Sequence, residues 1–394
     1  MKIAIIGGGP AGLMAALSSK GDIYLYEKNS DVGKKLLLTG NGRCNYWNSN
    51  QNISKYHSSN IDILSNIINK ENLDIVYKKI EDMGIVPIIK NGYYYPYSLK
   101  SSSVKSILKQ SCINNGVHFI YDIDINNIDY KNNKFIINGD KFDKVILATG
   151  AKSYPKTGSD GMGYRIAKKF GHTILDINPS LVQLITNTGL EKSLSGIRAE
   201  VVVSHFENDL LVKKEEGEIQ FTDYGLSGIC IFNLSRDIRI GLNKNNRESV
   251  HINFVPWCSN TLDYLTKLSI KYPKSNISEL SDGFIDYKLV NVLLKSIHVD
   301  ATRRWVDLNK KEKELLVNAL TDYKIDIIDT KGFDNAQTCS GGIPLSEVNP
   351  QTMESLKCRG LYFAGEILDV DGDCGGYNLT FAFLSGYLAG DYRD

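Results

Sequence analysis

The sequence predicts an α/β protein whose first domain is assembled from both ends of the chain, with a β-rich domain and a small helical insertion between those ends. A strand, a glycine turn, a helix and a second strand fit into the first 27 residues. Residues 144–148 and 361–364 are evenly apolar, as in strands that are covered on both faces. From about residue 179 the pattern changes to alternating, half-buried strands. At 394 residues, the chain is also too long for one ordinary hydrophobic core.

The first element is a βαβ unit, with strands at Lys2–Ile6 and Asp22–Glu27 and a helix at Leu13–Lys20. Between them lies the motif G-x-G-x-x-G, whose first glycine makes a tight turn, whose second lets a pyrophosphate approach the backbone, and whose third allows close helix packing. The positive end of the helix dipole then faces the phosphates. The motif residues counted as cofactor-binding are Gly7, Gly9, Pro10, Ala11 and Gly12.

Glu27 closes the second strand, where a carboxylate can accept hydrogen bonds from both hydroxyls of a ribose and would repel a 2′-phosphate. Lys28, next to it, is counted with the same site. These features predict an adenine dinucleotide but do not distinguish FAD from NAD. The alternative is a structural glycine turn with no ligand.

The middle of the chain continues the first domain. A helical pattern covers Ile61–Met83, and strand patterns cover Val117–Ile125, Phe135–Asn138 and Lys144–Ala148. The aromatic run Tyr93–Tyr97 fits either a half-buried strand or the wall of a ligand cavity.

The second domain is predicted from strand patterns, and Asn260–Leu320 within it has helical periodicity. The strands are expected at 200–206, 210–213, 218–222, 250–255 and 323–328, and the clearest helices at 287–296 and 310–320. The predicted boundaries are residues 1–180 and 335–394 for the first domain, 181–258 and 321–334 for the β-rich domain, and 259–320 for the helical insertion.

The C-terminal segment favours FAD. The strand Leu361–Ala364 ends in Gly365 and Glu366, and the glycine-rich segment from Asp373 opens a helix expected to run from about Leu379 to Leu388. An NAD domain rarely needs a second ligand-shaped loop from the far end of the chain. In a flavoprotein such a loop places helix amides beside the pyrimidine edge of the flavin ring. A glycine-rich turn without a ligand is the alternative.

Several of these motifs together resemble a known family of bacterial NAD(P)/FAD-dependent oxidoreductases, which includes aminoacetone oxidase and the dehydro-steroid reductase of bile-acid type. The matching segments are 7–12, 40–45, 148–155, 157–161 and 365–378, so the resemblance spans nearly the whole chain. It implies a discontinuous Rossmann-like FAD-binding domain, an inserted β-barrel-like domain and a helical insertion within that.

The resemblance also implies positions along FAD. It places Glu27 on the adenosine ribose, the backbone of Ile125 by the adenine, and Thr149 and Gly150 under the dinucleotide. Lys35, Arg43, Cys44 and Asn45 are placed beside the phosphates or the flavin, and Gly365, Glu366, Gly375, Gly376, Tyr377, Asn378 and Leu379 along the ribityl chain and ring. Arg43 sits in a glycine-rich loop without neighbouring carboxylates, which favours a phosphate contact.

Composition limits the other chemistry. The net charge of +1 argues against a basic surface for nucleic acid, and no apolar stretch is long enough to cross a membrane. Seven cysteines without a CxxC pair and six scattered histidines predict neither disulfides nor a metal site. Cys339 and Cys374 are interpreted as structural thiols. The glycine cluster interrupts any signal-peptide core, so a cytoplasmic location is expected.

The predicted function is that of an FAD-dependent oxidoreductase, in which the flavin carries the chemistry and no catalytic side chain is named. Hydride would pass through flavin N5 between a small organic substrate or NAD(P)H and either dioxygen or a conjugated acceptor. With one dinucleotide fingerprint, NAD(P)H would visit the flavin as a transient electron donor. The alternatives are an RNA-modifying flavoprotein and a non-catalytic flavin or nucleotide sensor. The sequence does not indicate the substrate or the oligomeric state.

Overall fold

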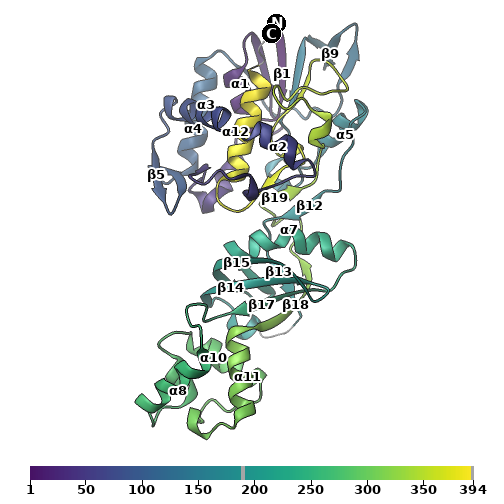
Figure 1. The fold of residues 1–394 in the computed structure, drawn as a ribbon. Helices are drawn as coiled ribbons and strands as arrows, with labels where there is room; N and C mark the ends of the chain where they lie inside the picture. Colours follow the sequence, from purple (N-terminus) through teal and green to yellow (C-terminus); the bar gives the residue numbers. More distant parts are fainter. Residues whose placement is uncertain (188–190, 392–394) are drawn as a thin grey trace. The chain divides into compact units, whose positions relative to one another are not determined.

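The computed structural model describes residues 1–187 and 191–391, which form two compact units. Unit 1 comprises Met1–Ser180 and Phe333–Asp394, and unit 2 comprises Leu181–Gly332. The fold class is therefore α/β, with a unit built from both ends of the chain and a second unit inserted between them. Figure 1 shows the chain coloured along the sequence.

Unit 1 is built on a five-stranded parallel sheet with the strand order β20-β11-β1-β2-β7. The strands are β1 (Lys2–Ile6), β2 (Asp22–Tyr26), β7 (His118–Ile120), β11 (Lys144–Leu147) and β20 (Leu361–Phe363). The side chains of Ile5, Ile146 and Phe363 are fully buried. The evenly apolar segments predicted as covered strands are therefore confirmed, and one of them comes from the far end of the chain.

Two glycines bring the last helix against the first. Helix α1 (Pro10–Ser18) and helix α12 (Tyr377–Gly390) lie side by side in Figure 1. A Cβ atom added to Gly386 would lie 2.3 Å from the carbonyl oxygen of Ala11, and one on Gly390 would lie 2.4 Å from that of Ala15. The absence of side chains at these positions lets the two backbones approach closely.

The remaining helices of unit 1 are α2 (Ile61–Ile67), α3 (Lys70–Asp82), α4 (Ser101–Asn114) and α5 (Met162–Lys169). The single helix predicted over 61–83 is thus two, because the Asn69 side chain accepts a hydrogen bond from the Asn72 amide and starts α3 there. The strand predicted over 117–125 is shorter, since only residues 118–120 pair with β2. Both segments nevertheless lie in the first unit.

Smaller sheets complete unit 1. They are β3 (Trp47–Asn48) with β6 (Tyr93–Pro96) and β5 (Pro87–Lys90), β8 (Asp129–Lys131) with β9 (Lys134–Ile137) and β10 (Asp140–Phe142), β12 (Asn178–Ser180) with β19 (Thr338–Ser340), and β4 (Tyr56–His57) with β21 (Asp371–Gly372). The β4–β21 pair joins a segment after the βαβ unit to the C-terminal glycine-rich segment.

Unit 2 contains a closed barrel with the strand order β13-β16-β15-β14-β17-β18. Its strands are β13 (Leu184–Thr186), β14 (Arg198–Glu207), β15 (Leu210–Phe221), β16 (Gly225–Gly228), β17 (Glu248–Asn253) and β18 (Tyr323–Thr330). The predicted strands at 210–213 and 218–222 are one continuous strand. Helix α7 (Ile229–Asn243), which the sequence did not indicate, contributes Ile231, Leu234 and Ile238 to the same core as the barrel.

The helical part of unit 2 contains α8 (Thr261–Lys271), α9 (Ile277–Ser281), α10 (Tyr287–Ser296) and α11 (Lys310–Thr321), and a short helix, α6 (Glu191–Leu194), lies between the barrel strands β13 and β14. Capping boxes start two of them, formed by Asn276 with Glu279 and by Asn309 with Glu312. These helices and the barrel share one hydrophobic core. The three-way division predicted from the sequence stays a prediction. Among the described helices, none is both long and apolar enough to span a bilayer.

Candidate cofactor site

The glycine turn between β1 and α1 has the geometry that its three glycines require. Gly7 has a φ of +106° and donates its N–H to the Tyr26 oxygen at 2.8 Å. A Cβ on Gly12 would lie 1.9 Å from the Gly7 oxygen, so this position must be glycine for the helix to pack. The Cβ direction of Gly9 meets no atom within 4 Å, which leaves the backbone open to a ligand. Pro10 begins α1, where its missing N–H costs nothing.

Glu27 lies beside this turn with only 8% of its surface exposed. Its Oε2 accepts a hydrogen bond from the Gly8 N–H at 2.9 Å. Its Oε1 accepts hydrogen bonds from the Asn29 N–H at 2.8 Å and from Asn29 Nδ2 at 2.7 Å. A carboxylate has about four acceptor directions, so these contacts leave one for a ribose hydroxyl where the sequence suggested two.

The two predicted lysines are both engaged in ion pairs. Lys28 Nζ lies 2.7 Å from Asp160 Oδ2. Lys35 Nζ lies 2.5 Å from Glu366 Oε2, and both side chains are about one-fifth exposed. Lys35 and Glu366 are therefore brought together from opposite ends of the chain and pair with each other, a contact that the sequence did not indicate.

Glu366 is also held by three further donors on its other oxygen. Glu366 Oε1 accepts hydrogen bonds from Ser153 Oγ at 2.6 Å, Thr338 Oγ1 at 3.0 Å and the Cys339 N–H at 2.9 Å. Sequence reasoning missed Ser153 and Thr338 as members of the site. Ser153 lies within the resembling segment 148–155, and that was the signal available.

Gly365 places the C-terminal strand end against the glycine turn. Its φ is +77°, and its N–H donates to Ser385 Oγ at 2.9 Å. A Cβ on Gly365 would lie 2.8 Å from Ala11 Cβ, which shows how closely this strand end approaches the start of α1. The beginning and the end of the chain thus meet at the same point of the sheet.

The glycine-rich loop before α12 packs on the segment that follows the first βαβ unit. Gly375 and Gly376 have φ values of +139° and +95°. A Cβ on Gly375 would lie 2.6 Å from Tyr93 Cε1, and one on Gly376 would lie 2.7 Å from the Trp47 oxygen. The Asn45 side chain also lies beside Gly376. Tyr93, the first residue of the tyrosine run, therefore packs against this loop.

Helix α12 begins with no side-chain cap. Its N-cap residue is Gly376, so within residues 1–187 and 191–391 no side chain takes the first-turn N–H groups, which Tyr377, Asn378 and Leu379 provide. The Asn378 side chain is used elsewhere, since its Oδ1 accepts from the Gly372 N–H at 2.9 Å and its Nδ2 donates to the Gly372 oxygen at 2.8 Å. The helix start is thus available to a negatively polarised ligand group.

Arg43 and Cys44 face different environments. Arg43 is exposed and has no carboxylate partner among the described residues, so its guanidinium is available for a phosphate. The Cys44 side chain is fully buried, and burial raises the pKa of its thiol to about 12. Cys44 therefore contributes to packing, and any contact with a ligand would come from its backbone.

Thr149 and Gly150 follow β11 on one side of β1, and Ile125 follows β7 on the other side, near Glu27. A Cβ on Gly163 of α5 would lie 2.0 Å from Thr149 Oγ1, so Thr149 packs against that helix. Gly150 has a φ of +73°. Ile125 is 4% exposed in the irregular segment after β7, which runs past Glu27 because the Ile123 N–H donates to the Glu27 oxygen at 3.3 Å.

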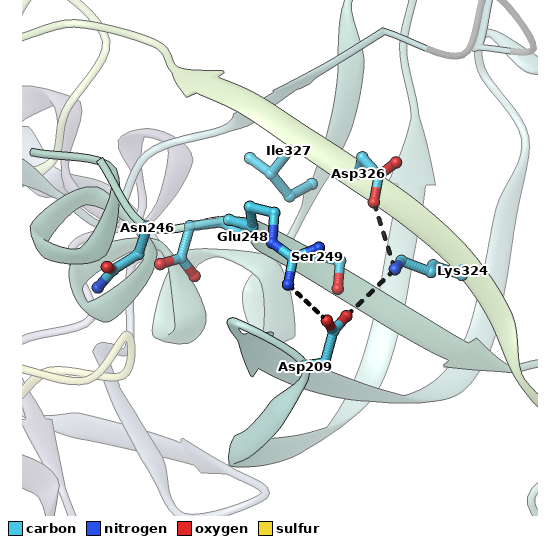
Figure 2. A pocket seen from close by; sticks show the side chains of 8 residues that line it. Asp209, Asn246, Glu248, Ser249, Lys324, Asp326 and Ile327 are labelled. Atoms are coloured by element: carbon cyan, nitrogen blue, oxygen red, sulfur yellow. Dashed lines mark hydrogen bonds and ion pairs between the residues drawn. The ribbon is translucent and has the colours of Figure 1, made fainter. Parts of the chain in front are cut away.

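A separate polar pocket lies at the barrel of unit 2 and is shown in Figure 2. Its cations are already paired: Arg247 with Asp209 at 2.8 Å, and Lys324 with Asp209 at 3.6 Å and with Asp326 at 3.7 Å. Asn246, Glu248, Ser249 and Ile327 complete its lining. Because its cations are already paired with carboxylates, we assign it no ligand.

Comparison with known proteins identifies the family. The family model described as the HI0933-like protein Rossmann domain matches residues 1–392. The chain belongs to this HI0933-like family. The expected resemblance to FAD-dependent oxidoreductases is thereby confirmed, and the HI0933-like chain is an FAD-dependent oxidoreductase.

The chain is similar over nearly its whole length to two curated relatives and to one solved structure. It is 35% identical over 99% of its length to a 3-dehydro-bile acid delta(4,6)-reductase of Clostridium scindens, covering 98% of that protein. It is 27% identical over 97% of its length to the ribosomal RNA dihydrouridine synthase of Escherichia coli, covering 95% of it. The open conformation of a flavocytochrome c3 fumarate reductase matches 99% of this chain and 77% of its own, with 13% identity and a TM-score of 0.50, which shows a shared fold.

The residues of this HI0933-like protein fit FAD at two places. The open backbone at Gly9, next to the start of α1, suits a pyrophosphate. The uncapped start of α12, behind glycines that no larger residue could replace, suits the polar edge of a flavin ring. Among the described residues no cluster of His, Cys, Asp or Glu is arranged to hold a metal ion.

The two cysteines singled out in the sequence are not joined in a disulfide, and neither is any other of the seven cysteines. Burial raises the pKa of Cys339 to about 12 and that of Cys374 to about 11. Such thiols are protonated and unreactive at neutral pH, which supports a structural role for both.

Proposed function

We propose that this HI0933-like flavoprotein reduces a carbon–carbon double bond conjugated to a carbonyl group in a small apolar substrate, with NAD(P)H as the electron donor. The observation that carries the proposal is the full-length similarity, at 35% identity, to a reductase named for delta(4,6) bonds of a 3-dehydro-bile acid. The second relative is named for making dihydrouridine, in which a carbonyl-conjugated double bond has likewise been saturated. Both relatives therefore point to the same type of bond.

The proposed FAD contacts follow the sequence prediction. The pyrophosphate would lie over Gly7, Gly9, Pro10, Ala11 and Gly12, and the adenosine ribose at Glu27 with the backbone of Ile125 nearby. Lys28, Lys35, Arg43, Cys44, Asn45, Thr149 and Gly150 would line the dinucleotide, and Gly365, Glu366, Gly375, Gly376, Tyr377, Asn378 and Leu379 the ribityl chain and ring. The open backbone at the glycines supports backbone contacts there. Lys28 and Lys35 already form ion pairs with carboxylates, so any contact of theirs with FAD would be made in addition to these pairs.

The bound flavin would supply hydride transfer, which no protein side chain can carry out. The task left to the chain is to hold and tune the ring. The first-turn N–H groups of α12 would donate to the pyrimidine edge of the ring and favour the negative charge of its reduced form. The Lys35–Glu366 pair, held by Ser153, would fix the loop between strand β20 and that helix.

The test is product analysis. The purified protein, loaded with FAD, is incubated without oxygen with NADH or NADPH and a 3-oxo-4-ene bile acid. A product two hydrogens heavier, formed only with the nicotinamide and the protein together, is the expected result. The proposal is wrong if the steroid is recovered unchanged and, in a separate aerobic assay, small amines drive oxygen uptake, because that is the behaviour of an oxidase.

A second candidate is reduction of uridine in ribosomal RNA, which the relative from Escherichia coli favours. The net charge of +1 weighs against it, because RNA binding usually draws on a basic surface. A salt-sensitive gel shift with ribosomal RNA, together with formation of dihydrouridine, would favour this candidate over the small-molecule substrate.

A further inference from the structure

A histidine, a lysine and a buried aspartate meet beside the glycine-rich loop that precedes α12. In the β4–β21 pair, His57 is opposite Asp371 and Tyr56 is opposite Gly372. The next residue of the loop, Asp373, donates its N–H to the Lys55 oxygen at 2.9 Å. The segment 55–57 is thereby fixed against the residues that lead into the start of α12.

The Asp373 side chain is 4% exposed and contacts the side chains of both Lys55 and His57. Its Oδ2 lies 3.1 Å from Lys55 Nζ, and its Oδ1 lies 3.3 Å from His57 Nε2. A buried carboxylate needs such partners, because an unpaired charge in the interior is costly. The aspartate therefore fixes which nitrogen of the His57 ring is turned inward.

The other ring nitrogen of His57, Nδ1, makes no hydrogen bond with any residue that the structure describes. The His57 side chain is 23% exposed, so solvent or a bound molecule can reach it. The groups packed around it are Lys55, Asp373 and the buried Asp371. An imidazole held at one nitrogen by a carboxylate and free at the other is the arrangement used for proton transfer in enzymes.

We propose that His57 donates the proton that completes reduction of the conjugated double bond, and that Asp373 is its positioning residue. This inference rests on the function proposed above. It assigns a proton donor to a site at which the sequence indicated no catalytic side chain.

The step balances as follows. The β carbon of the enone receives a hydride, and with it two electrons, from the reduced flavin. The π electrons of the double bond move toward the carbonyl and leave the α carbon basic. The α carbon takes a proton from His57, which ends as neutral imidazole and regains a proton from water at its exposed edge. The double bond is reduced and the flavin is oxidised.

Other acids near the loop are less suited. Burial raises the pKa of Tyr377 to about 12 and that of Cys374 to about 11, so both hold their protons too tightly for efficient transfer near neutral pH. The His57 side chain, in contrast, is 23% exposed, so water can return a proton to the ring after transfer.

The experiment separates the two half-reactions of the FAD-loaded protein by stopped-flow absorbance. In the His57→Gln variant, NAD(P)H should bleach the flavin at the wild-type rate. Ferricyanide should also reoxidise the reduced flavin of this variant at the wild-type rate, because ferricyanide takes up electrons without a proton on carbon. Reoxidation by a 3-oxo-4-ene bile acid should be slower by about 100-fold or more, the usual contribution of general acid catalysis. Enone reoxidation at the wild-type rate would overturn the inference.

The matched control is His118→Gln. His118 also pairs with an aspartate, with its Nε2 3.2 Å from Asp22 Oδ1, but both side chains are about half exposed and lie on strands β7 and β2. This variant should react with the enone as the wild type does. An equal loss in both variants would mean that the effect is not specific to the loop, and would count against His57.

Asp373→Asn tests the positioning role by two readouts. It should lower kcat for the enone while KM and FAD affinity stay within about twofold, and it should shift the His57 ring resonances in the NMR spectrum of the oxidised holoenzyme. Unmoved ring resonances would overturn the positioning role even if His57→Gln failed to fold. If wild-type protein bleaches with NAD(P)H but is never reoxidised by the enone, the proposed function fails, and that result is distinct from a failure of His57 alone.

Discussion

Glu27 combines a structural contact and a proposed ligand contact in one carboxylate. It holds the Gly8 N–H and the Asn29 side chain, with one acceptor direction left for a ribose hydroxyl. Glu27→Gln should weaken FAD binding by about 10- to 100-fold, because a hydrogen bond to a charged acceptor contributes roughly 1.5–3 kcal/mol. Titration of the apoprotein with FAD, followed by flavin fluorescence, measures this.

The control is Asp22→Asn, on the same strand β2, where the side chain is half exposed and pairs with His118. FAD affinity should be unchanged in this variant. Equal affinity in Glu27→Gln and wild type would refute the ribose assignment.

Single residues also mark the limit of what the sequence could predict. Spacing alone placed Glu27 and the three glycines, because their roles are local to one βαβ unit. Lys35 was expected beside the phosphates or the flavin, and its ion pair with Glu366 was not foreseen. Such a pairing depends on how residues 331 positions apart meet in the fold, for which the sequence carries no local pattern. Asn29 was missed for a related reason, since its contact with Glu27 depends on the turn after β2.

The contact between helices α1 and α12 depends on small residues. Replacing Gly386 with alanine would put a Cβ 2.3 Å from the Ala11 oxygen. Alanine favours a helix over glycine by up to about 1 kcal/mol, but overpacking of this kind costs about 1–3 kcal/mol. Gly386→Ala should therefore lower the free energy of unfolding and, because α12 shifts, weaken FAD binding.

Gly283→Ala in unit 2 is the comparison, since a Cβ there meets no atom within 4 Å. Chemical denaturation followed by circular dichroism should show a loss of stability for Gly386→Ala only. Equal stability of the two variants would show that the helix contact can relax at no cost.

A partly buried cluster of polar side chains joins the segment after α5 to the C-terminal part of unit 1. His172 Nδ1 lies 2.9 Å from Glu347 Oε2, and Lys357 Nζ lies 2.6 Å from Glu347 Oε1. Burial by itself would raise the pKa of Glu347, but hydrogen bonds from Lys357, Thr173 and His172 outweigh it and hold the pKa at about 2. This is below the usual value of 4.5.

Because the folded-state pKa is depressed, the Glu347 carboxylate stabilises the protein above pH 4.5, and this contribution is lost as the pH falls from 4.5 toward 2. Glu347→Gln should remove this part of the acid dependence, on the order of 2 kcal/mol. Urea denaturation between pH 3 and 6 measures it. Glu314→Gln, at an exposed pair with Lys310, is the control and should keep the wild-type slope. The assignment would be contradicted if the free energy of unfolding of Glu347→Gln fell with decreasing pH as steeply as that of the wild type.

The spacing of apolar residues predicted a helix or strand correctly where one periodic pattern dominated its segment. Helix α10 has the predicted bounds, because its apolar residues fall on one buried face and Asp286 caps its start. Helix α7 was missed because it opens with the apolar run Ile229–Phe232, which fits a strand as well as a helix. Strand β15 was split in two because its charged middle, Lys213–Glu218, shows no apolar face.

At the scale of the whole molecule, the main feature is that both ends of the chain build one sheet. The sequence predicted that the C-terminal strand returns to the first domain, since 361–364 had the same even apolarity as 144–148. It did not predict that β20 would pair with β11 at the edge, because strand order is a property of the folded sheet. The closed barrel of unit 2 was expected only through the family resemblance.

The central claim is that the first glycine turn and the start of α12 hold one FAD together. Hydrogen–deuterium exchange of the apoprotein and the FAD-loaded protein tests it most directly, because amides that contact a ligand exchange more slowly. We expect FAD to slow exchange in residues 7–13 and in residues 376–380, with one FAD bound per chain. Protection in only one of these two segments, or in neither, would contradict the claim.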